Sequence, residues 1–296
     1  MTEWVESIEV DGRVRRCICH VPDRVTPGLP LLIVLHGRNL TIDEIRRITH
    51  FDALADRRGF VVAYPEGYKR SWNDGRSNSP AQEEGFDDTA FIRALIDRLG
   101  EKGIDTELIA ATGLSNGGVL CQRLGLELSD RIGTIAPVAG LMPVSLAAVT
   151  PDHAVSVLQI QGTEDRSMPI EGGRARGRGR LLLLLGGVRR RAEPVLSLAG
   201  TVERWREIDG CDQRTQLDPL VPTGRDPTKV ERVVYSGGRG GTVVESWSVV
   251  GGGHTWPGGP SFGGLMGRTT RHFDAGEVIW EFVRRSTHSA KDRRLS

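Results

Sequence analysis

The sequence predicts an α/β fold with a mostly parallel central sheet and helices on both of its faces. Apolar runs of strand length, such as Leu31 to Leu35 and Phe60 to Tyr64, alternate with segments of helical period. Strands buried on both faces read as continuous apolar runs, and their alternation with helices is typical of a parallel sheet. At 296 residues the chain can bury one large core, so we expect a single domain over residues 1–296.

The first element that we expect is a β-hairpin. Trp4 to Val10 and Val14 to Val21 alternate between apolar and polar residues, and the turn pair Asp11-Gly12 lies between them. After the strand at Leu31 to Leu35, the segment Ile42 to Arg58 has a helix-like pattern.

A polar loop then runs from about Glu66 to Phe86 and carries the sequence Trp72-Asn73-Asp74-Gly75. Asp87-Asp88 is typical of the start of a helix, which we expect to continue to Leu99. Later elements complete the alternation, with strands at Leu108 to Thr112, Thr134 to Val138, Ala154 to Ile160, Lys229 to Tyr235 and Thr242 to Val250, and helices at Ser197 to Gly210 and Asp274 to Arg285.

The charge balance excludes a global attraction to nucleic acid or to an anionic membrane. Lys and Arg number 39 and Asp and Glu 38, which leaves a net charge of +1. The chain has no run of about 18 apolar residues, so we expect no membrane span. Residues Met1 to Glu6 lack the basic and apolar regions of a secretory signal peptide.

The four cysteines, Cys17, Cys19, Cys121 and Cys211, are too few and too scattered for a disulfide framework. Cys17-Ile18-Cys19-His20 contains metal-binding residue types, but no second Cys or His cluster lies at ligand spacing. Alternation on a strand explains the same residues, so we predict no metal site.

A low-complexity insertion interrupts the pattern at about residues 172–191, where arginines and glycines precede the leucines Leu181 to Leu185. An Arg/Gly segment can bind an RNA backbone, and a leucine-rich loop beside an active site can act as a lid. We favour a third interpretation, a solvated insertion, and expect no nucleic-acid partner.

The segment Gly113-Leu114-Ser115-Asn116-Gly117 predicts a nucleophilic serine. An apolar strand precedes it, and Val119, Leu120, Leu124 and Leu128 follow with helical period. A strand that turns sharply into a helix exposes the serine hydroxyl, and glycines on both sides remove the Cβ clashes of that turn. In a chain with 38 glycines this motif alone is a weak signal. Residues later in the sequence therefore decide whether Ser115 is predicted to be a nucleophile.

A serine hydroxyl is a poor nucleophile at neutral pH, so it needs a base, and the base needs an orienting carboxylate. In an α/β-hydrolase the acid follows the serine in a loop after a strand, and the histidine comes last. The loop Gln161-Gly162-Thr163-Glu164-Asp165 follows such a strand. Glu164 and Asp165 both qualify, and we favour Asp165.

Seven histidines compete for the role of the base. His254 alone follows a late strand, in the loop Gly251-Gly252-Gly253-His254-Thr255-Trp256-Pro257, whose glycines let the chain reach over the serine. We therefore predict a catalytic triad of Ser115, Asp165 and His254.

The oxyanion hole of such a site needs two backbone donors. The N–H of Asn116 is the first, because this residue directly follows the nucleophile. The second should come from the loop after Leu35, which reads His36-Gly37-Arg38-Asn39. We favour the N–H of Arg38, with Asn39 as the alternative.

Two motifs occur together in this chain, Trp-Asn-Asp-Gly at 72–75 and Gly-His-Thr-Trp-Pro-Gly at 253–258. With the serine motif and Asp165, they resemble the polyhydroxybutyrate depolymerase-like esterase family, which includes feruloyl and acetylxylan esterases. The similarity extends from about Ser7 to Arg284. It implies an α/β-hydrolase fold and a serine carboxylesterase with no cofactor.

The resemblance also implies the substrates, which are small-molecule or oligomeric esters: hydroxyalkanoate oligomers, or feruloyl and acetyl esters of plant polysaccharide. The resemblance implies secretion, whereas no signal peptide is recognised at the N-terminus of this sequence, so the compartment stays open between secretion and the cytoplasm.

The chain departs from the family at Arg38, where a cysteine or small residue is common, and at Met168, where valine is common. We expect Arg38 to narrow the acyl site, so that neutral esters of short acyl groups are preferred. Trp72, Trp256 and Asn39 are the expected substrate contacts, because tryptophans at one mouth can stack on a ferulate ring or cover a hydroxybutyrate chain.

Two alternative functions stay open. A catalytically idle hydrolase fold can bind a partner through residues 174–191, and a serine peptidase can share the fold. A fluorophosphonate probe would leave the first unlabelled, and the relative rates on a peptide amide and an aryl ester distinguish the second.

Overall fold

The computed structural model describes residues 2–22, 28–106, 108–174, 192–264 and 266–294. Its strands form one ten-stranded sheet. In chain order the strands are β1 (Thr2–Val10), β2 (Arg13–Val21), β3 (Leu31–Leu35), β4 (Val61–Pro65), β5 (Ile109–Leu114), β6 (Thr134–Val138), β7 (Ser156–Gly162), β8 (Gln213–Leu220), β9 (Lys229–Ser236) and β10 (Val244–Val250).

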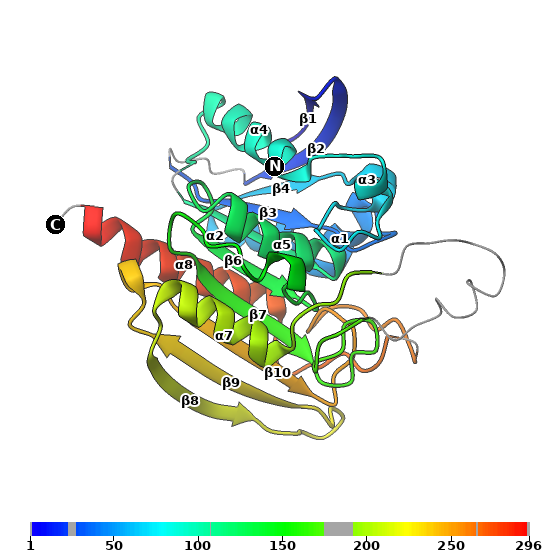
Figure 1. Ribbon diagram of the computed structural model, residues 1–296, viewed down its shortest axis with the longest axis vertical. Helices are drawn as coiled ribbons and strands as arrows, with labels where there is room; N and C mark the ends of the chain where they lie inside the picture. Colours follow the sequence, from blue (N-terminus) through cyan, green and yellow to red (C-terminus); the bar gives the residue numbers. More distant parts are fainter. Residues whose placement is uncertain (1, 23–27, 107, 175–191, 265, 295–296) are drawn as a thin grey trace.

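The centre of the sheet is parallel and its edges are antiparallel. The strand order is β1-β2-β4-β3-β5-β6-β7-β10-β9-β8, in which the six strands from β4 to β10 run parallel (Figure 1). Two strands at each edge pair antiparallel. The prediction of a mostly parallel sheet is therefore confirmed.

Burial explains which strands the sequence revealed. Every residue of β3, β4, β5, β6 and β7 is buried, as their apolar sequences require. Edge strand β8 is exposed along most of its length and has a polar sequence, so sequence periodicity did not predict it.

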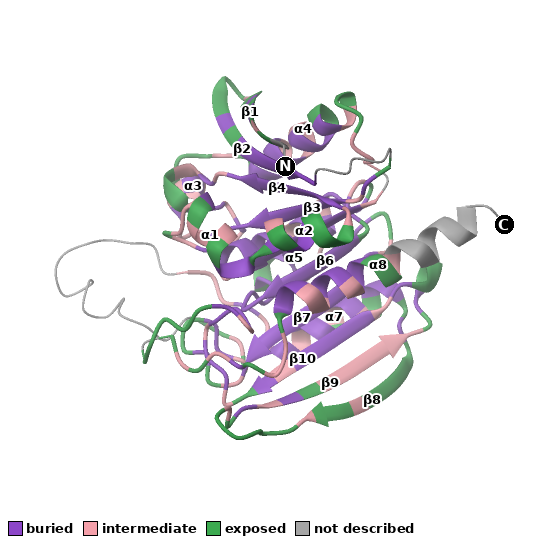
Figure 2. Ribbon diagram, turned by 180° about the vertical axis from the view of Figure 1, so that it is seen from behind, coloured by how far each residue is buried: buried purple, intermediate pink, exposed green. Residues whose placement is uncertain are grey.

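Helices cover both faces of the sheet, as predicted. Figure 1 shows α4, α5 and α7 on one face, and Figure 2, from behind, shows α1, α2 and α8 on the other. The helices are α1 (Ile42–Thr49), α2 (Phe51–Arg58), α3 (Pro80–Glu83), α4 (Asp88–Glu101), α5 (Asn116–Glu127), α7 (Leu198–Asp209) and α8 (Ala275–Arg294), with 3₁₀ turns η1 (Tyr68–Arg70), η2 (Val144–Leu146) and η3 (Arg239–Gly241).

Each face has its own hydrophobic core. Phe91 of α4 and Trp205 of α7 belong to one core, and Phe51 of α2 and Trp280 of α8 belong to the other. The sheet between them positions the residues that follow the carboxyl ends of its parallel strands. No helix in the described part of the chain is both long enough and apolar enough to cross a membrane.

The helical prediction for Ile42 to Arg58 is confirmed, but two helices occupy this segment. His50 adopts φ 54° and ψ 26°, which ends α1, and α2 begins at the next residue. At the other end of α1, the Thr41 hydroxyl accepts the N–H of Glu44 and the Glu44 carboxylate accepts the N–H of Thr41.

The predicted hairpin is confirmed. Val10 pairs with Arg13, and the two turn residues Asp11 and Gly12 have φ 51° and 69°. Positive φ at both positions gives the turn a twist that matches the strands.

The insertion expected at 172–191 lies mostly outside the described residues, which stop at Arg174 and resume at residue 192. Its flanks meet: the N–H of Gly173 donates to the carbonyl of Val195 at 2.8 Å, and the N–H of Val195 donates back at 2.9 Å. The described residues on the two sides of this gap are therefore hydrogen-bonded to each other.

Candidate active site

Ser115 lies on a sharp turn between β5 and α5. Its φ of 58° and ψ of −116° are unusual for a residue with a side chain, and such conformations cost about 1–3 kcal/mol. A Cβ at Gly113 would lie 2.7 Å from the carbonyl carbon of Gly117, and one at Gly117 would collide with the Leu35 oxygen. The Ser115 N–H donates to the carbonyl of Val138 at 2.9 Å. Glycine is therefore required at both positions for the strand and helix to meet.

The loop after β3 lies against this turn. A Cβ at Gly37 would be 3.6 Å from the Cβ of Ser115. Asn39 adopts φ 66°, a conformation that asparagine tolerates, and its N–H donates to the carbonyl of Arg70 at 2.8 Å. Because the Asn39 N–H is engaged there, Arg38 is the stronger candidate for the second oxyanion donor.

Asp165, on the loop after β7, contacts the candidate base. Its Oδ2 lies 2.7 Å from Nδ1 of His254 and accepts a hydrogen bond from Gln161 Nε2 at 3.1 Å. Its Oδ1 accepts the N–H groups of Ser167 and Met168 at 2.8 and 2.7 Å. The side chain is fully buried, so these donors hold the carboxylate in one orientation toward the histidine.

His254 lies on the loop after β10, where backbone pairing fixes its position. Its N–H donates to the carbonyl of Met266 at 2.6 Å, and the N–H of Gly253 donates to the carbonyl of Arg268 at 2.9 Å. Glu164 is directed elsewhere, since its carboxylate is 60% exposed and lies 3.7 Å from Arg268. Of the two acidic residues considered in this loop, Asp165 reaches the imidazole.

These side chains follow neighbouring parallel strands. Ser115 follows β5, Asp165 follows β7 and His254 follows β10, and β5, β6, β7 and β10 are consecutive in the sheet. The carboxyl ends of parallel strands share one edge, which is where open α/β sheets bind ligands. The structure therefore places the predicted triad residues on one edge of the sheet.

The expectation that Trp72 and Trp256 contact substrate is corrected by their burial. Trp72 is fully buried, its ring N–H donates to the carbonyl of His36 at 2.8 Å, and its ring packs on the His36 ring at 4.7 Å. Trp256 is 1% exposed and meets Phe51 edge to face at 5.9 Å. A ring without an exposed face cannot stack on a substrate, so both tryptophans pack the loops.

Sequence reasoning gave no role to His36, which organises the loops on this side of the site. Its Nδ1 lies 2.9 Å from the carbonyl of Gly37, and its Nε2 accepts the N–H of Gly67 at 2.9 Å. Burial lowers the pKa of His36 to about 4, so the ring is neutral near neutral pH. It acts as a structural bridge between two loops.

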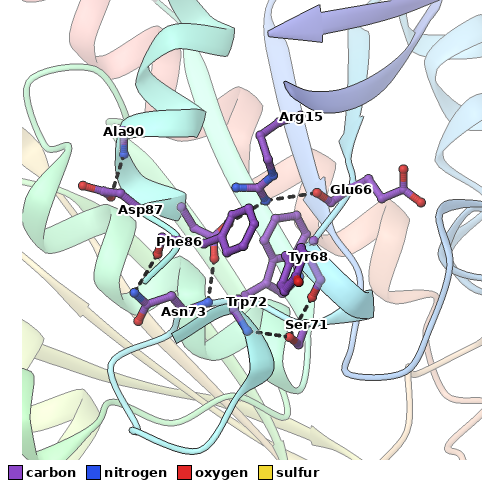
Figure 3. A network of polar contacts seen from close by, with 12 residues as sticks. Arg15, Glu66, Tyr68, Ser71, Trp72, Asn73, Phe86, Asp87 and Ala90 are labelled. Atoms are coloured by element: carbon purple, nitrogen blue, oxygen red, sulfur yellow. Dashed lines mark hydrogen bonds and ion pairs between the residues drawn. The ribbon is translucent and has the colours of Figure 1, made fainter. Parts of the chain in front are cut away.

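Figure 3 shows the polar contacts that fix the loop of Trp72 and Asn73. The N–H of Asn73 donates to Asp88 at 2.6 Å, and its Nδ2 donates to the carbonyl of Phe86 at 2.8 Å. Asp88 is paired with Arg15 at 2.7 Å in the interior. Burial raises the pKa of Asp88, and the guanidinium of Arg15 opposes this rise.

The thiols of Cys17 and Cys19 are buried with 3.9 Å between their sulfur atoms, on strand β2 as predicted. Within the residues that the structure describes, no group of three His, Cys, Asp or Glu side chains is arranged to hold a metal ion.

Comparisons with known proteins agree with this architecture. Residues 18–171 match the family described as Esterase PHB depolymerase. The chain is 30% identical over 288 residues to NocK of Nocardia uniformis subsp. tsuyamanensis, to which an esterase activity is ascribed, covering 95% of this chain and 83% of that protein. It is 31% identical over 155 residues to the bifunctional acetylxylan esterase/xylanase XynS20E of Neocallimastix patriciarum, covering 52% of this chain and 22% of that larger protein.

Among solved structures, acetyl xylan esterase from Aspergillus awamori has a similar fold, with a TM-score of 0.57 and 12% sequence identity. The match covers 85% of this chain and 94% of that one, and it confirms the α/β-hydrolase fold. The chain belongs to the PHB depolymerase family of esterases and is a hydrolase of carboxylic esters.

Proposed function

We propose that the chain is a serine carboxylesterase in which Ser115, His254 and Asp165 form the catalytic triad. The Ser115 hydroxyl attacks the ester carbonyl carbon, and Nε2 of His254 takes the hydroxyl proton as the C–O bond forms. The tetrahedral intermediate collapses, His254 gives the proton to the departing alcohol, and an acyl-enzyme remains on Ser115. Water then attacks the acyl-enzyme with His254 again as the base, which releases the acid.

Asp165 orients the histidine in this proposal. A proton on Nδ1 of His254 directed to the carboxylate leaves Nε2 as the nitrogen that accepts the serine proton. The carboxylate also stabilises the imidazolium that forms in each step. The N–H groups of Asn116 and Arg38 donate to the oxyanion of both tetrahedral intermediates.

The observation that best supports the proposal is the part-buried 2.7 Å contact between Asp165 and His254, at the edge of the sheet where the strained Ser115 turn also lies. A histidine paired with a buried carboxylate, at the same sheet edge as a serine with positive φ, is the arrangement that nucleophilic catalysis needs.

We further propose that neutral esters with short acyl groups are the substrates. Acetyl and feruloyl esters of plant polysaccharide and oligomers of 3-hydroxybutyrate are the candidates, in line with the family to which the chain belongs. Arg38 narrows the acyl side of the site, and the exposed side chain of Asn39 on the same loop contacts the substrate.

The test is hydrolysis of p-nitrophenyl esters of rising chain length, with methyl ferulate, acetylated xylan and 3-hydroxybutyrate oligomers alongside. We expect kcat/KM for acetate and butyrate to exceed that for decanoate by at least about tenfold, ~1.4 kcal/mol. Ser115→Ala should lower kcat by several decades, leaving about 10³–10⁴-fold catalysis over water from the remaining contacts. A Ser115→Ala variant that keeps more than about a tenth of the wild-type rate would refute the nucleophile.

A further inference from the structure

The loop of Trp72 and Asp74 reaches the reaction centre through the side chain of Asn116. The Oδ1 of Asn116 accepts the N–H of Trp72 at 2.8 Å. Its Nδ2 donates to the carbonyl of Trp72 at 3.2 Å and to Oδ2 of Asp74 at 2.5 Å. Asn116 is only 2% exposed, so these three bonds replace the water that its amide would otherwise bind.

Asp74 is the fixed end of this contact. It is fully buried, and its Oδ1 accepts the N–H of Arg76 at 3.0 Å. Its Oδ2 accepts hydrogen bonds from Nη2 and Nε of Arg76 at 2.6 and 3.0 Å. A guanidinium keeps its charge over the working pH range, so Arg76 holds the carboxylate in place and leaves it an acceptor for Asn116.

The backbone of the serine turn has its own supports. The N–H of Ser115 donates to Val138, and glycine contacts bring the turn against Leu35. The contact between Asp74 and Asn116 is therefore an additional restraint, and it acts on the residue that follows the nucleophile.

We propose that Asp74 is a positioning residue of the oxyanion hole, because it clamps the Asn116 side chain and thereby fixes the direction of the Asn116 N–H. This inference rests on the proposed function, in which that N–H donates to the oxyanion. The side chain and the N–H share one Cα, so a clamped amide limits rotation of the peptide group. An oxyanion donor must lie about 2.7–3.1 Å from the developing charge, and an error of about 0.5 Å is enough to weaken it.

The first test is Asp74→Asn. The Asp74 carboxylate accepts hydrogen bonds on both oxygens, from Arg76 and from Asn116. An amide has only one oxygen, so its NH₂ group must face one of these donors. We expect kcat to fall by about 10- to 100-fold with KM unchanged, since loss of a whole oxyanion donor costs about 10²–10³-fold. An equal fall in kcat and kcat/KM is the sign of a contact made only in the transition state.

The matched control is Asp88→Asn. Asp88 is also fully buried and paired with an arginine, and it also bonds the same loop, through the N–H of Asn73. It should lower the melting temperature but leave kcat unchanged to within about 1.5-fold, as a change outside the reacting groups does. Equal kcat losses in the two variants would overturn the inference, because general loosening of the loop would then explain both.

A charge swap tests the contact itself. Asn116→Asp places a second carboxylate against Asp74, and we expect a larger loss of kcat than in Asp74→Asn. The double variant Asp74→Asn with Asn116→Asp restores an amide–carboxylate pair in reverse and should recover at least about tenfold over Asn116→Asp, the size of a strong pair coupling. Additive losses would contradict the proposed contact.

Two further measurements keep the outcome clear. If Asp74→Asn does not fold, Arg76→Lys removes only the forked support, and it should lower kcat by about threefold without changing KM; an unchanged kcat overturns the inference. Labelling of Ser115 by a fluorophosphonate is followed in each variant. A labelled Asp74→Asn with wild-type kcat refutes the positioning role alone, whereas an unlabelled wild-type enzyme refutes the proposed function.

Discussion

The serine turn and the histidine loop are held in different ways. The turn at Ser115 needs glycine two residues before and two residues after the serine, since Gly113 and Gly117 leave room for backbone contacts that a side chain would block. The loop at His254 depends on distant residues, because its N–H pairs with the carbonyl of Met266, twelve positions later, and Gly253 pairs with Arg268. The turn therefore needs small residues close to the serine in sequence, and the loop needs backbone pairing with a later segment of the chain.

Asp226, between β8 and β9, extends the support of the histidine loop. Its Oδ1 accepts the hydroxyl of Thr228 at 2.6 Å, and its Oδ2 accepts the hydroxyl of Thr270 at 3.1 Å and the N–H of Arg271 at 2.5 Å. The carbonyl of Thr270 in turn accepts the N–H of Gly258 on the histidine loop. The connection between β8, which the sequence did not predict, and β9, which it did, therefore helps to place the candidate base. The difference teaches that a candidate nucleophile can be recognised from its local sequence, whereas the support of its candidate base is visible only in the assembled fold.

The largest expected effect separates the two acidic residues beside the histidine. Asp165→Asn should lower kcat by about 10⁴-fold, as the same change does in serine proteases, because the amide no longer holds the His254 tautomer. Glu164→Gln should change kcat by less than about twofold, since its carboxylate is 60% exposed. Steady-state hydrolysis of p-nitrophenyl acetate measures both. Equal losses of kcat in the two variants would contradict Asp165 as the residue that orients His254. The comparison of the serine turn with the histidine loop would then lose its basis.

A pair of glycine substitutions tests the local half of the comparison. Gly117→Ala should lower the free energy of unfolding by more than about 3 kcal/mol, because its Cβ would meet the Leu35 carbonyl and the backbone cannot yield. Gly251→Ala, in the histidine loop, should cost only about 1–2 kcal/mol, since its Cβ enters open space and only the φ of 77° is strained. Urea unfolding followed by circular dichroism gives both values. A larger cost at Gly251 would reverse the comparison.

Asp226→Asn tests the long-range half, and its effect should depend on pH. Partial burial by itself raises the pKa of Asp226, but hydrogen bonds from Thr228, Arg271 and Thr270 outweigh it and lower the pKa to about 2. An unfolded aspartate has a pKa of about 3.9, so the carboxylate stabilises the fold above about pH 4 and loses this effect as pH falls through about 2.

The melting temperature of Asp226→Asn should therefore lie below that of the wild type at pH 7, with a difference that shrinks between about pH 4 and pH 2. We also expect a modest loss of kcat, about three- to tenfold, because the histidine loop loosens. A difference in melting temperature that stays constant down to pH 2 would show that the carboxylate charge is not what holds the loop.

Much of the central fold could be predicted from the sequence, because full burial on both faces forces continuous apolar runs such as β3 and β7. The serine turn could also be predicted, since the glycines on both sides of Ser115 are needed to avoid steric clashes there. The sequence could not show strand β8, because a polar edge strand has no hydrophobic periodicity. It could not show the break at His50 either, because a single left-handed residue does not change the hydrophobic pattern around it.

The roles of the tryptophans could not be predicted either. Trp72 and Trp256 have the residue type of a substrate platform, but only the packed structure shows that His36 and Phe51 cover their rings. The clamp on Asn116 was likewise hidden, because Asp74 lies 42 positions earlier in the chain. Contacts between residues so far apart in the sequence depend on the topology of the fold, which hydrophobic periodicity does not predict.

The most direct measurement of the central claim is peptide mapping after reaction with a fluorophosphonate. We expect one phosphonyl adduct, on Ser115, that is absent from Ser115→Ala and forms several decades more slowly in His254→Ala, because the serine then lacks its base. An adduct on another residue, or labelling of Ser115→Ala at the wild-type rate, would contradict Ser115 as the nucleophile.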